Sequence, residues 1–263
     1  MKTIKTNKSI KTLFPVLIAG MMVVLQVSCS DLLMEKPDSF YDSAKIFENA
    51  SNAQLGLNGV YNALAGIEHY GQWEMAVPTS DDMYFISGTN SDGSRRDISH
   101  YQLSTSNVWV TDLWKNKYLG IERANSVLTG LKGMKEYASG DEEIQRIEGE
   151  ALFLRALLSF DLVRYWGDVP YKTELTTFEN SYQPRTGKEV IYDQIVADLN
   201  RSKSLLKWAT NGTNTERATQ GAARALLMRV YLHRAGYSLD SETAQYVIKD
   251  EAERQQYFQL VLD

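Results

Sequence analysis

Apolar residues recur at helical spacing along most of the chain, so the pattern predicts a mainly α-helical protein. The strongest pattern covers residues 141–170, where we expect Gly167 and Pro170 to end the helix and Trp166 to join the core. We expect Gly66 to stop the first helix. Weaker apolar stripes predict further helices over residues 53–64, 114–128, 186–206, 219–236 and from about 250 onward.

Several polar residues predict how these helices begin and how they are tied together. Thr186 and Glu189 have the spacing of a capping box. Asn125 lies on an apolar face, and a buried amide needs hydrogen-bond partners, so we expect it to tie helices together. Arg155 and Arg224 lie beside apolar stripes and are expected to reach carboxylates or carbonyls of neighbouring helices.

A short internal repeat indicates how the helices are arranged. The sequence RALL occurs at residues 155–158 and again at 224–227, and Gly167 and Gly236 share the same offset of 69 residues. A tetratricopeptide unit is a helix pair of about 34 residues, so this offset is close to two units. We therefore expect tetratricopeptide-like helical hairpins, with a chance match of four residues as the alternative.

The stretch from Ile67 to Val108 lacks sustained periodicity. Its length is unusual for a loop, and its aromatic content argues against disorder. We interpret it as a long aromatic and polar loop region with a functional role.

The first 28 residues are typical of a secretory signal peptide. Four lysines precede an apolar run at residues 13–27, which is shorter than the ~20 residues of a spanning helix. The alternative is a short membrane anchor. Without residues 1–28 the net charge moves from −5 to −9, because they hold four lysines and no acidic residue. Such an acidic body disfavours nucleic acid as a partner.

Cys29 is the only cysteine and directly follows this segment. It cannot form an intrachain disulfide, and a free thiol is a hazard in an oxidising compartment. Covalent lipidation of the Cys29 sulfur would account for both the missing disulfide partner and the free thiol. Ser28 supplies the small residue expected before the point where the signal peptide is cleaved. Gln26 departs from the pattern, because an aliphatic residue is usual at that position. We expect residues 1–28 to be a lipoprotein signal peptide, 29–45 a lipidated tether and 46–263 the folded domain. A soluble secreted protein is the alternative.

Six ordered blocks then resemble the SusD/RagB family of outer-membrane lipoproteins, over the N-terminal half of the family's length. The blocks are SCSDLLMEKP, SNAQLGLNGVYNAL, LWKNKYLGIERANSVL, EGEALFLRALLSFDLVRYWGDVP, RTGKEVIYDQIVADL and TQGAARALLMRVYL. The resemblance implies the family's α-helical fold, here truncated.

The resemblance also implies a role in nutrient uptake. Family members sit on the outer membrane through a lipid anchor, face the exterior, bind glycans and deliver them to a SusC-like TonB-dependent transporter. Two alternatives stay open: a tetratricopeptide-like scaffold of outer-membrane assembly, and a receptor for peptide uptake.

Candidate glycan-binding residues lie in the long loop region. Flat aromatic faces suit the C–H surfaces of neutral sugars, and Asp, Asn and Arg bond their hydroxyls. The candidates are Trp73, Asp81, Tyr84, Asn90 and Arg95. For each of them the alternative is a packing or turn role within the loop.

Catalysis finds little support in the sequence, and we expect a protein that is not an enzyme. The three histidines lack zinc-ligand spacing, and no nucleophile elbow or phosphate-cradling loop is present. Asp81 and Asp82 are the only hint of a glycosidase, but adjacent residues of an extended loop point to opposite sides. We expect no cofactor and no catalytic metal, and leave open a structural Ca²⁺ ion, for which no EF-hand pattern exists.

We predict that the mature protein carries acyl chains on Cys29. Mass spectrometry of the processed N-terminal peptide should find them, and Cys29→Ser should release the processed protein from membranes because the acyl chains are its expected anchor. A bare thiol on the processed chain would contradict this prediction. A protein untouched by proteolysis of intact cells would contradict the expected exposure at the cell surface.

Overall fold

The computed structural model describes residues 46–65, 97–98, 100–210, 216–240 and 242–262. The chain separates into units of residues 1–41 and 42–263, and the described residues belong to the second unit. Cys29, the tether and the predicted stop at Gly66 lie outside the described residues.

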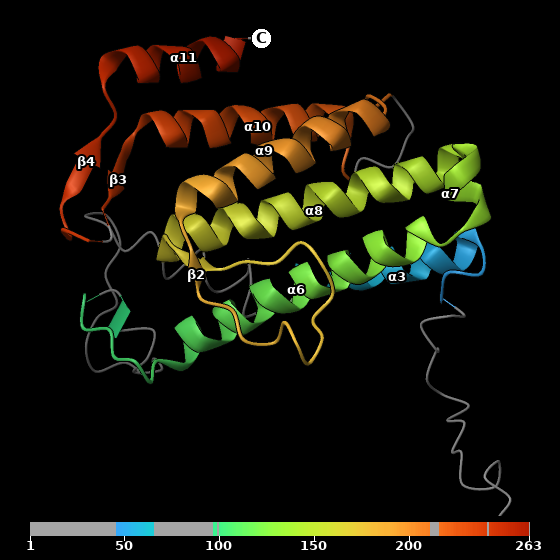
Figure 1. Cartoon of the computed structure of the whole chain (residues 1–263), viewed down its shortest axis with the longest axis horizontal. Coiled ribbons are helices and arrows are strands. Elements are labelled where there is room, and N and C mark those ends of the chain that lie inside the picture. Colours follow the sequence, from blue (N-terminus) through green and yellow to red (C-terminus); the bar gives the residue numbers. More distant parts are fainter. Residues whose placement is uncertain (1–45, 66–96, 99, 211–215, 241, 263) are drawn as a thin grey trace, which may run out of the picture. The chain divides into compact units, whose positions relative to one another are not determined.

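The described part is mainly α-helical, as the periodicity predicts (Figure 1). The helices are α3 (Ala50–Asn62), α6 (Val108–Lys132), α7 (Lys135–Ser139), α8 (Glu142–Trp166), α9 (Lys188–Leu205), α10 (Gln220–Ala235) and α11 (Glu251–Leu262). Two short antiparallel pairs accompany them: β1 (Val169–Pro170) with β2 (Arg185–Thr186), and β3 (Tyr237–Leu239) with β4 (Tyr246–Ile248). No described helix has the length and apolar character needed to cross a membrane.

Helices that follow one another in the chain pack side by side. α8 packs on α9, α9 on α10 and α10 on α11, while α3 and α6 cover the other side of α8 (Figure 1). The two RALL segments lie on α8 and α10, the first helices of two successive helix pairs. The prediction of helical hairpins is therefore confirmed.

Several predicted helix ends coincide with the observed caps. Gly167 follows α8 with φ of +66°, a conformation that suits glycine. The Thr219 side chain accepts a hydrogen bond from the Ala222 N–H at the start of α10, as expected of an N-cap residue. Gly236 follows the end of α10.

The capping box predicted at Thr186 and Glu189 is wrong. Thr186 pairs with Val169 in the β1–β2 ladder, so the helix begins one residue later, after Gly187. The Asp168 carboxylate accepts the Lys188 N–H at 2.9 Å instead. A side chain that directly precedes β1 thus supplies the cap that the local sequence was expected to supply.

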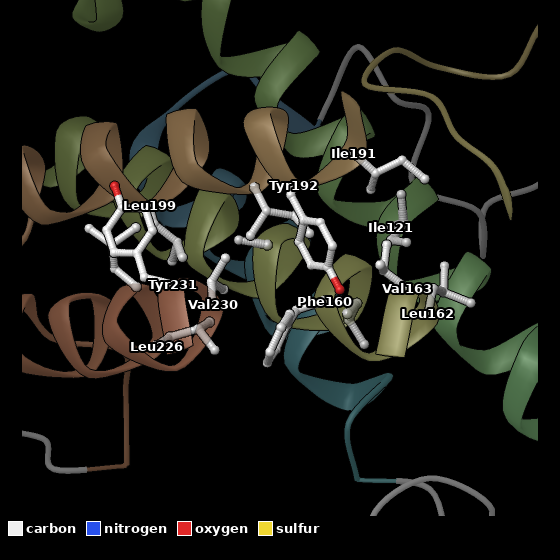
Figure 2. Packing of buried hydrophobic residues seen from close by; sticks show 14 of the residues in the cluster. Ile121, Phe160, Leu162, Val163, Ile191, Tyr192, Leu199, Leu226, Val230 and Tyr231 are labelled. Carbon is white, nitrogen blue, oxygen red and sulfur yellow. The ribbon is translucent and has the colours of Figure 1, made fainter. Parts of the chain in front are cut away.

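Two apolar clusters share α8 as their common wall. In one, α8, α9 and α10 meet around Phe160, Tyr192, Val230 and Tyr231 (Figure 2). In the other, α3, α6 and the first half of α8 meet around residues such as Leu57. Buried residues occur on all sides of α8, which is typical of a helix enclosed by its neighbours.

We predict opposite effects from alanine at two helical glycines. A Cβ added at Gly149 of α8 would lie 2.9 Å from the Leu206 Cγ and 3.1 Å from the Leu205 Cβ, whereas one at Gly59 of α3 meets nothing within 4 Å. Both changes gain about 1 kcal/mol of helix propensity, but Gly149→Ala also overpacks, at a cost of about 1–3 kcal/mol. Urea unfolding should show Gly59→Ala more stable than Gly149→Ala by about that cost. Equal free energies of unfolding would contradict the close contact between α8 and the end of α9.

Candidate functional site

The residues predicted to bind glycan lie outside the described part of the chain and stay predictions. They are Trp73, Asp81, Tyr84, Asn90 and Arg95. The described residues that follow them are anchored on the helices. Ile98 is buried and contacts a cluster formed by Leu113 of α6 with partly buried aromatic and aliphatic side chains, among them Trp109, Val110, Tyr165 and Trp166.

Aromatic side chains gather where the first half of α6 meets the end of α8. The Trp114 ring lies 4.9 Å from Tyr118 and 5.1 Å from Trp166, measured between ring centroids, and the tryptophan pair is edge to face. Tyr165 packs edge to face on Trp166 at 5.8 Å. Trp166 is part of the packed interior, as predicted, and it supports Trp114 from behind.

A groove of about 640 Å³ lies between α6 and the connection from α8 to α9. We call it the α6 groove. In Figure 1 this connection runs alongside α6 before it enters α9. Aromatic and aliphatic residues dominate the lining: Trp114, Tyr118, Leu119, Ile121, Pro170, Tyr171 and Tyr182. Its polar lining residues are Lys115, Glu122, Asn125, Lys172, Thr176, Ser181 and Gln183.

Hydrogen bonds hold the connection in shape. The Glu122 carboxylate of α6 accepts the Thr176 N–H at 2.9 Å and the Thr176 hydroxyl at 3.0 Å. The Lys172 ammonium donates to the Thr176 hydroxyl at 2.6 Å and to the Asn180 carbonyl at 3.1 Å. The Asn180 amide donates to the Glu174 carboxylate and the Leu175 carbonyl. The outer wall of the groove is therefore an ordered loop.

A buried polar network fastens the start of the connection to three helices. Arg155 of α8 donates to both Asp198 oxygens of α9, at 2.7 and 2.8 Å, and to the Asn125 oxygen of α6 at 2.9 Å. It also donates to the Thr173 carbonyl at 3.0 Å. The Asn125 amide donates to the carbonyls of Lys172 and Glu174 at 3.3 and 3.0 Å. The ties predicted for Asn125 and Arg155 are confirmed.

The tie predicted for Arg224 takes another form. Its guanidinium lies 5.8 Å from the ring centroid of the exposed Trp208, and its Nε is buried without a hydrogen-bond partner in the described part of the chain. A cation–π contact thus replaces the expected carboxylate or carbonyl.

Sequence reasoning missed a buried ion pair close to the groove. Lys117 of α6 is 1% exposed and bonds Asp161 of α8, which also accepts from Arg164 at 2.6 Å. Lys117 stands four residues from both Leu113 and Ile121 on the apolar stripe. That position was the available signal, because a charge on a buried stripe must find a partner.

Two phenol groups of the groove, those of Tyr118 and Tyr171, stay neutral. Burial raises the pKa of Tyr118, whose hydroxyl donates to the Pro170 carbonyl at 2.6 Å. Burial, followed by the charge of Asp198, raises the pKa of Tyr171 to about 12. The aromatic walls therefore carry no charge of their own near neutral pH.

A second cavity, of about 690 Å³, lies beside the ends of α9 and α10. Charged groups that line it pair with one another. The buried Glu150 accepts hydrogen bonds from Arg146, from Arg217 at 2.9 Å and from the Tyr61 hydroxyl at 2.7 Å. This network has the character of a structural tie.

No group of three or more His, Cys, Asp or Glu side chains that could bind a metal ion occurs among the described residues. His233 packs edge to face on Phe160 at 5.5 Å, and burial lowers its pKa below the ordinary 6.5. What the α6 groove offers is an aromatic binding surface.

The described part of the chain is a helical array with an aromatic groove between α6 and the connection from α8 to α9. A family model described as starch-binding and associating with the outer membrane matches residues 31–232. The chain belongs to this SusD-like family.

Relatives and solved structures agree with this membership. A SusD-like protein of Formosa agariphila is 26% identical over 236 residues, which cover 88% of this chain and 45% of the relative. A SusD homologue of Bacteroides thetaiotaomicron superposes with a TM-score of 0.69 at 25% identity, covering 84% of this chain and 42% of that one. A structure named as a laminarin-binding SusD-like protein superposes with a TM-score of 0.63 at 27% identity, covering 72% and 41%.

The chain spans less than half the length of the curated relatives that it matches. The six blocks recognised in the sequence begin within or just before the matched range and end with it. The predicted SusD-like α-helical fold is confirmed.

We predict that removing one partner of the buried Arg155–Asp198 ion pair destabilises the protein more than replacing both partners. Asp198→Ala should lower the free energy of unfolding by about 3–5 kcal/mol, because Arg155 is then left buried without its carboxylate. The double variant Arg155→Met/Asp198→Leu should lose clearly less, since no unpaired charge remains. Urea unfolding of Arg155→Met, of Asp198→Leu and of the double variant measures the coupling between the two residues. Additive losses would contradict the role assigned to the pair.

Proposed function

We propose that the chain is an outer-membrane lipoprotein that binds glycans and delivers them to a SusC-like TonB-dependent transporter. The match of residues 31–232 to a family described as starch-binding and outer-membrane-associated carries this proposal. The laminarin-binding name of one similar structure supports a carbohydrate ligand, because laminarin, like starch, is an uncharged glucan.

The chemistry of the chain suits such a ligand. Neutral sugars are recognised by aromatic faces and by a few hydrogen-bonding groups placed around them. The α6 groove has this composition, and so does the stretch that contains Trp73 and Tyr84.

Anchoring at the cell surface completes the proposal. Acyl chains on Cys29 would hold the protein at the outer membrane, facing the exterior, and residues 29–45 would act as the tether. The family's description as associating with the outer membrane supports this location.

Delivery requires a stable contact with a transporter. A permanent partner of this kind would need a large interface. Copurification of the tagged full-length chain from outer membranes tests it: a large TonB-dependent receptor should accompany the chain. Barrel-assembly components in its place would favour the scaffold alternative, and a peptide cargo would favour the peptide-uptake alternative.

We predict that Trp73→Ala weakens glycan binding. A glycan array on the full-length protein identifies the ligand, and affinity gel electrophoresis on that glycan then compares the variants. Trp73→Ala should migrate faster than wild type by an amount equivalent to at least about fivefold weaker binding, because truncating a central aromatic contact usually costs more than 1 kcal/mol.

Trp208→Ala is the matched control, since Trp208 is 60% exposed and lies outside the α6 groove. It should migrate like wild type. Unchanged migration of Trp73→Ala would contradict the assignment of Trp73 to the site, and an array without any glycan signal would contradict the proposed function.

A further inference from the structure

We propose that the α6 groove is itself a binding site for a neutral oligosaccharide, which rests on the proposed glycan-binding function and adds a site to the one predicted in residues 67–108. The groove is built entirely from described residues of α6 and of the connection between α8 and α9. Its volume of about 640 Å³ lies within the range of about 300–1,000 Å³ that is typical of sites for small molecules.

Both walls of the groove present aromatic side chains. Trp114 and Tyr118 belong to α6, while Tyr171 and Tyr182 belong to the connection. Trp114 is held from behind by Trp166, whereas Tyr182 is 90% exposed and is free to cover a ligand. Sugar rings offer apolar C–H faces that pack on such side chains, so a pyranose can lie between the two walls.

The acidic character of the chain favours an uncharged ligand over a polyanion. The chain carries a net charge of −5, which repels a polyanionic ligand. Within the groove, the Glu122 carboxylate accepts from Thr176, and the Lys172 ammonium donates to Thr176 and Asn180. These hydrogen bonds hold two of the three charged lining residues in the walls, and Lys115 is the third and is exposed.

Neutral hydrogen-bonding groups are also present. Gln183 lines the groove, and its side-chain amide has no hydrogen-bond partner among the described residues. Such an amide can donate to one sugar hydroxyl and accept from another. The Ser181 hydroxyl donates to the Phe178 carbonyl at 2.9 Å and keeps its capacity to accept.

The wall formed by the connection is ordered before any ligand arrives. Glu122, Asn125 and Arg155 fix it to the helices through hydrogen bonds. Binding therefore loses little conformational entropy in ordering this wall. This matters for a sugar, because a ligand with many hydroxyl groups gains little net free energy on binding.

The test compares three variants of the full-length chain in detergent solution. Tyr182→Ala removes an aromatic face of the groove, Tyr182→Phe keeps that face and loses only the hydroxyl, and Phe178→Ala is the matched control. Phe178 belongs to the same connection and is 93% exposed, but it does not line the groove. Affinity gels contain starch, laminarin or galactomannan as neutral polysaccharides, and alginate as the anionic one.

We predict that wild type is retarded in at least one neutral gel and not in alginate. Tyr182→Ala should bind that polysaccharide about five- to tenfold more weakly, while Tyr182→Phe and Phe178→Ala should bind like wild type. A Tyr182→Ala loss without any change in Trp73→Ala would support the groove and count against the loop assignment.

The opposing results separate the two proposals. If Tyr182→Ala binds like wild type while Trp73→Ala loses binding, the groove proposal is overturned and the proposed function stands. If no neutral gel retards wild type, the groove proposal is overturned, and the proposed function is overturned only if the glycan array also gives no signal. An equal loss of glycan retention in Phe178→Ala would show that the effect is not confined to the groove and would overturn the groove proposal. A loss of transporter copurification in Tyr182→Ala without a change in glycan retention would assign the connection to a protein partner and overturn it as well.

Discussion

The guanidinium of Arg155 lies where α6, α8, α9 and the connection between α8 and α9 meet. It bonds Asp198, Asn125 and the Thr173 carbonyl at once. Because a buried cation is costly without partners, each of these elements must keep its place for the others to be satisfied. Hydrophobic packing drives the helices together, but this network selects how they sit. The groove beside it depends on that selection.

The groove shows how a helical array can provide a surface for a neutral ligand. Helices alone present rows of side chains, and the connection from α8 to α9 adds a second wall opposite Trp114 and Tyr118. Several polar lining residues of the groove make hydrogen bonds that hold the connection in shape, for example Glu122 with Thr176. Both walls present aromatic side chains, which suit a ligand whose own groups are hydroxyls and C–H faces.

Membership of the SusD-like family indicates where in the cell these features act. The family is described as associating with the outer membrane, and the sequence places a lone cysteine after an apolar leader, where acylation would serve as the anchor. The described helices lack a segment able to span a membrane. The acidic character of the chain agrees with a ligand that is not an anion.

Periodicity in the sequence by itself determined the helices, the helix stop at Gly167 and the need of Asn125 and Arg155 for partners, because helix spacing and caps are local properties. The candidate loop residues from Trp73 to Arg95 stay predictions from the sequence, because they lie outside the described residues. Only the tertiary structure decided that Asp168 caps α9, that Arg224 stacks on Trp208 and that Lys117 is buried. It also decided the groove, whose walls come from residues 114–125 and 170–183. Side chains so far apart in the chain share no spacing, so their meeting follows from how the helices pack and not from any local pattern.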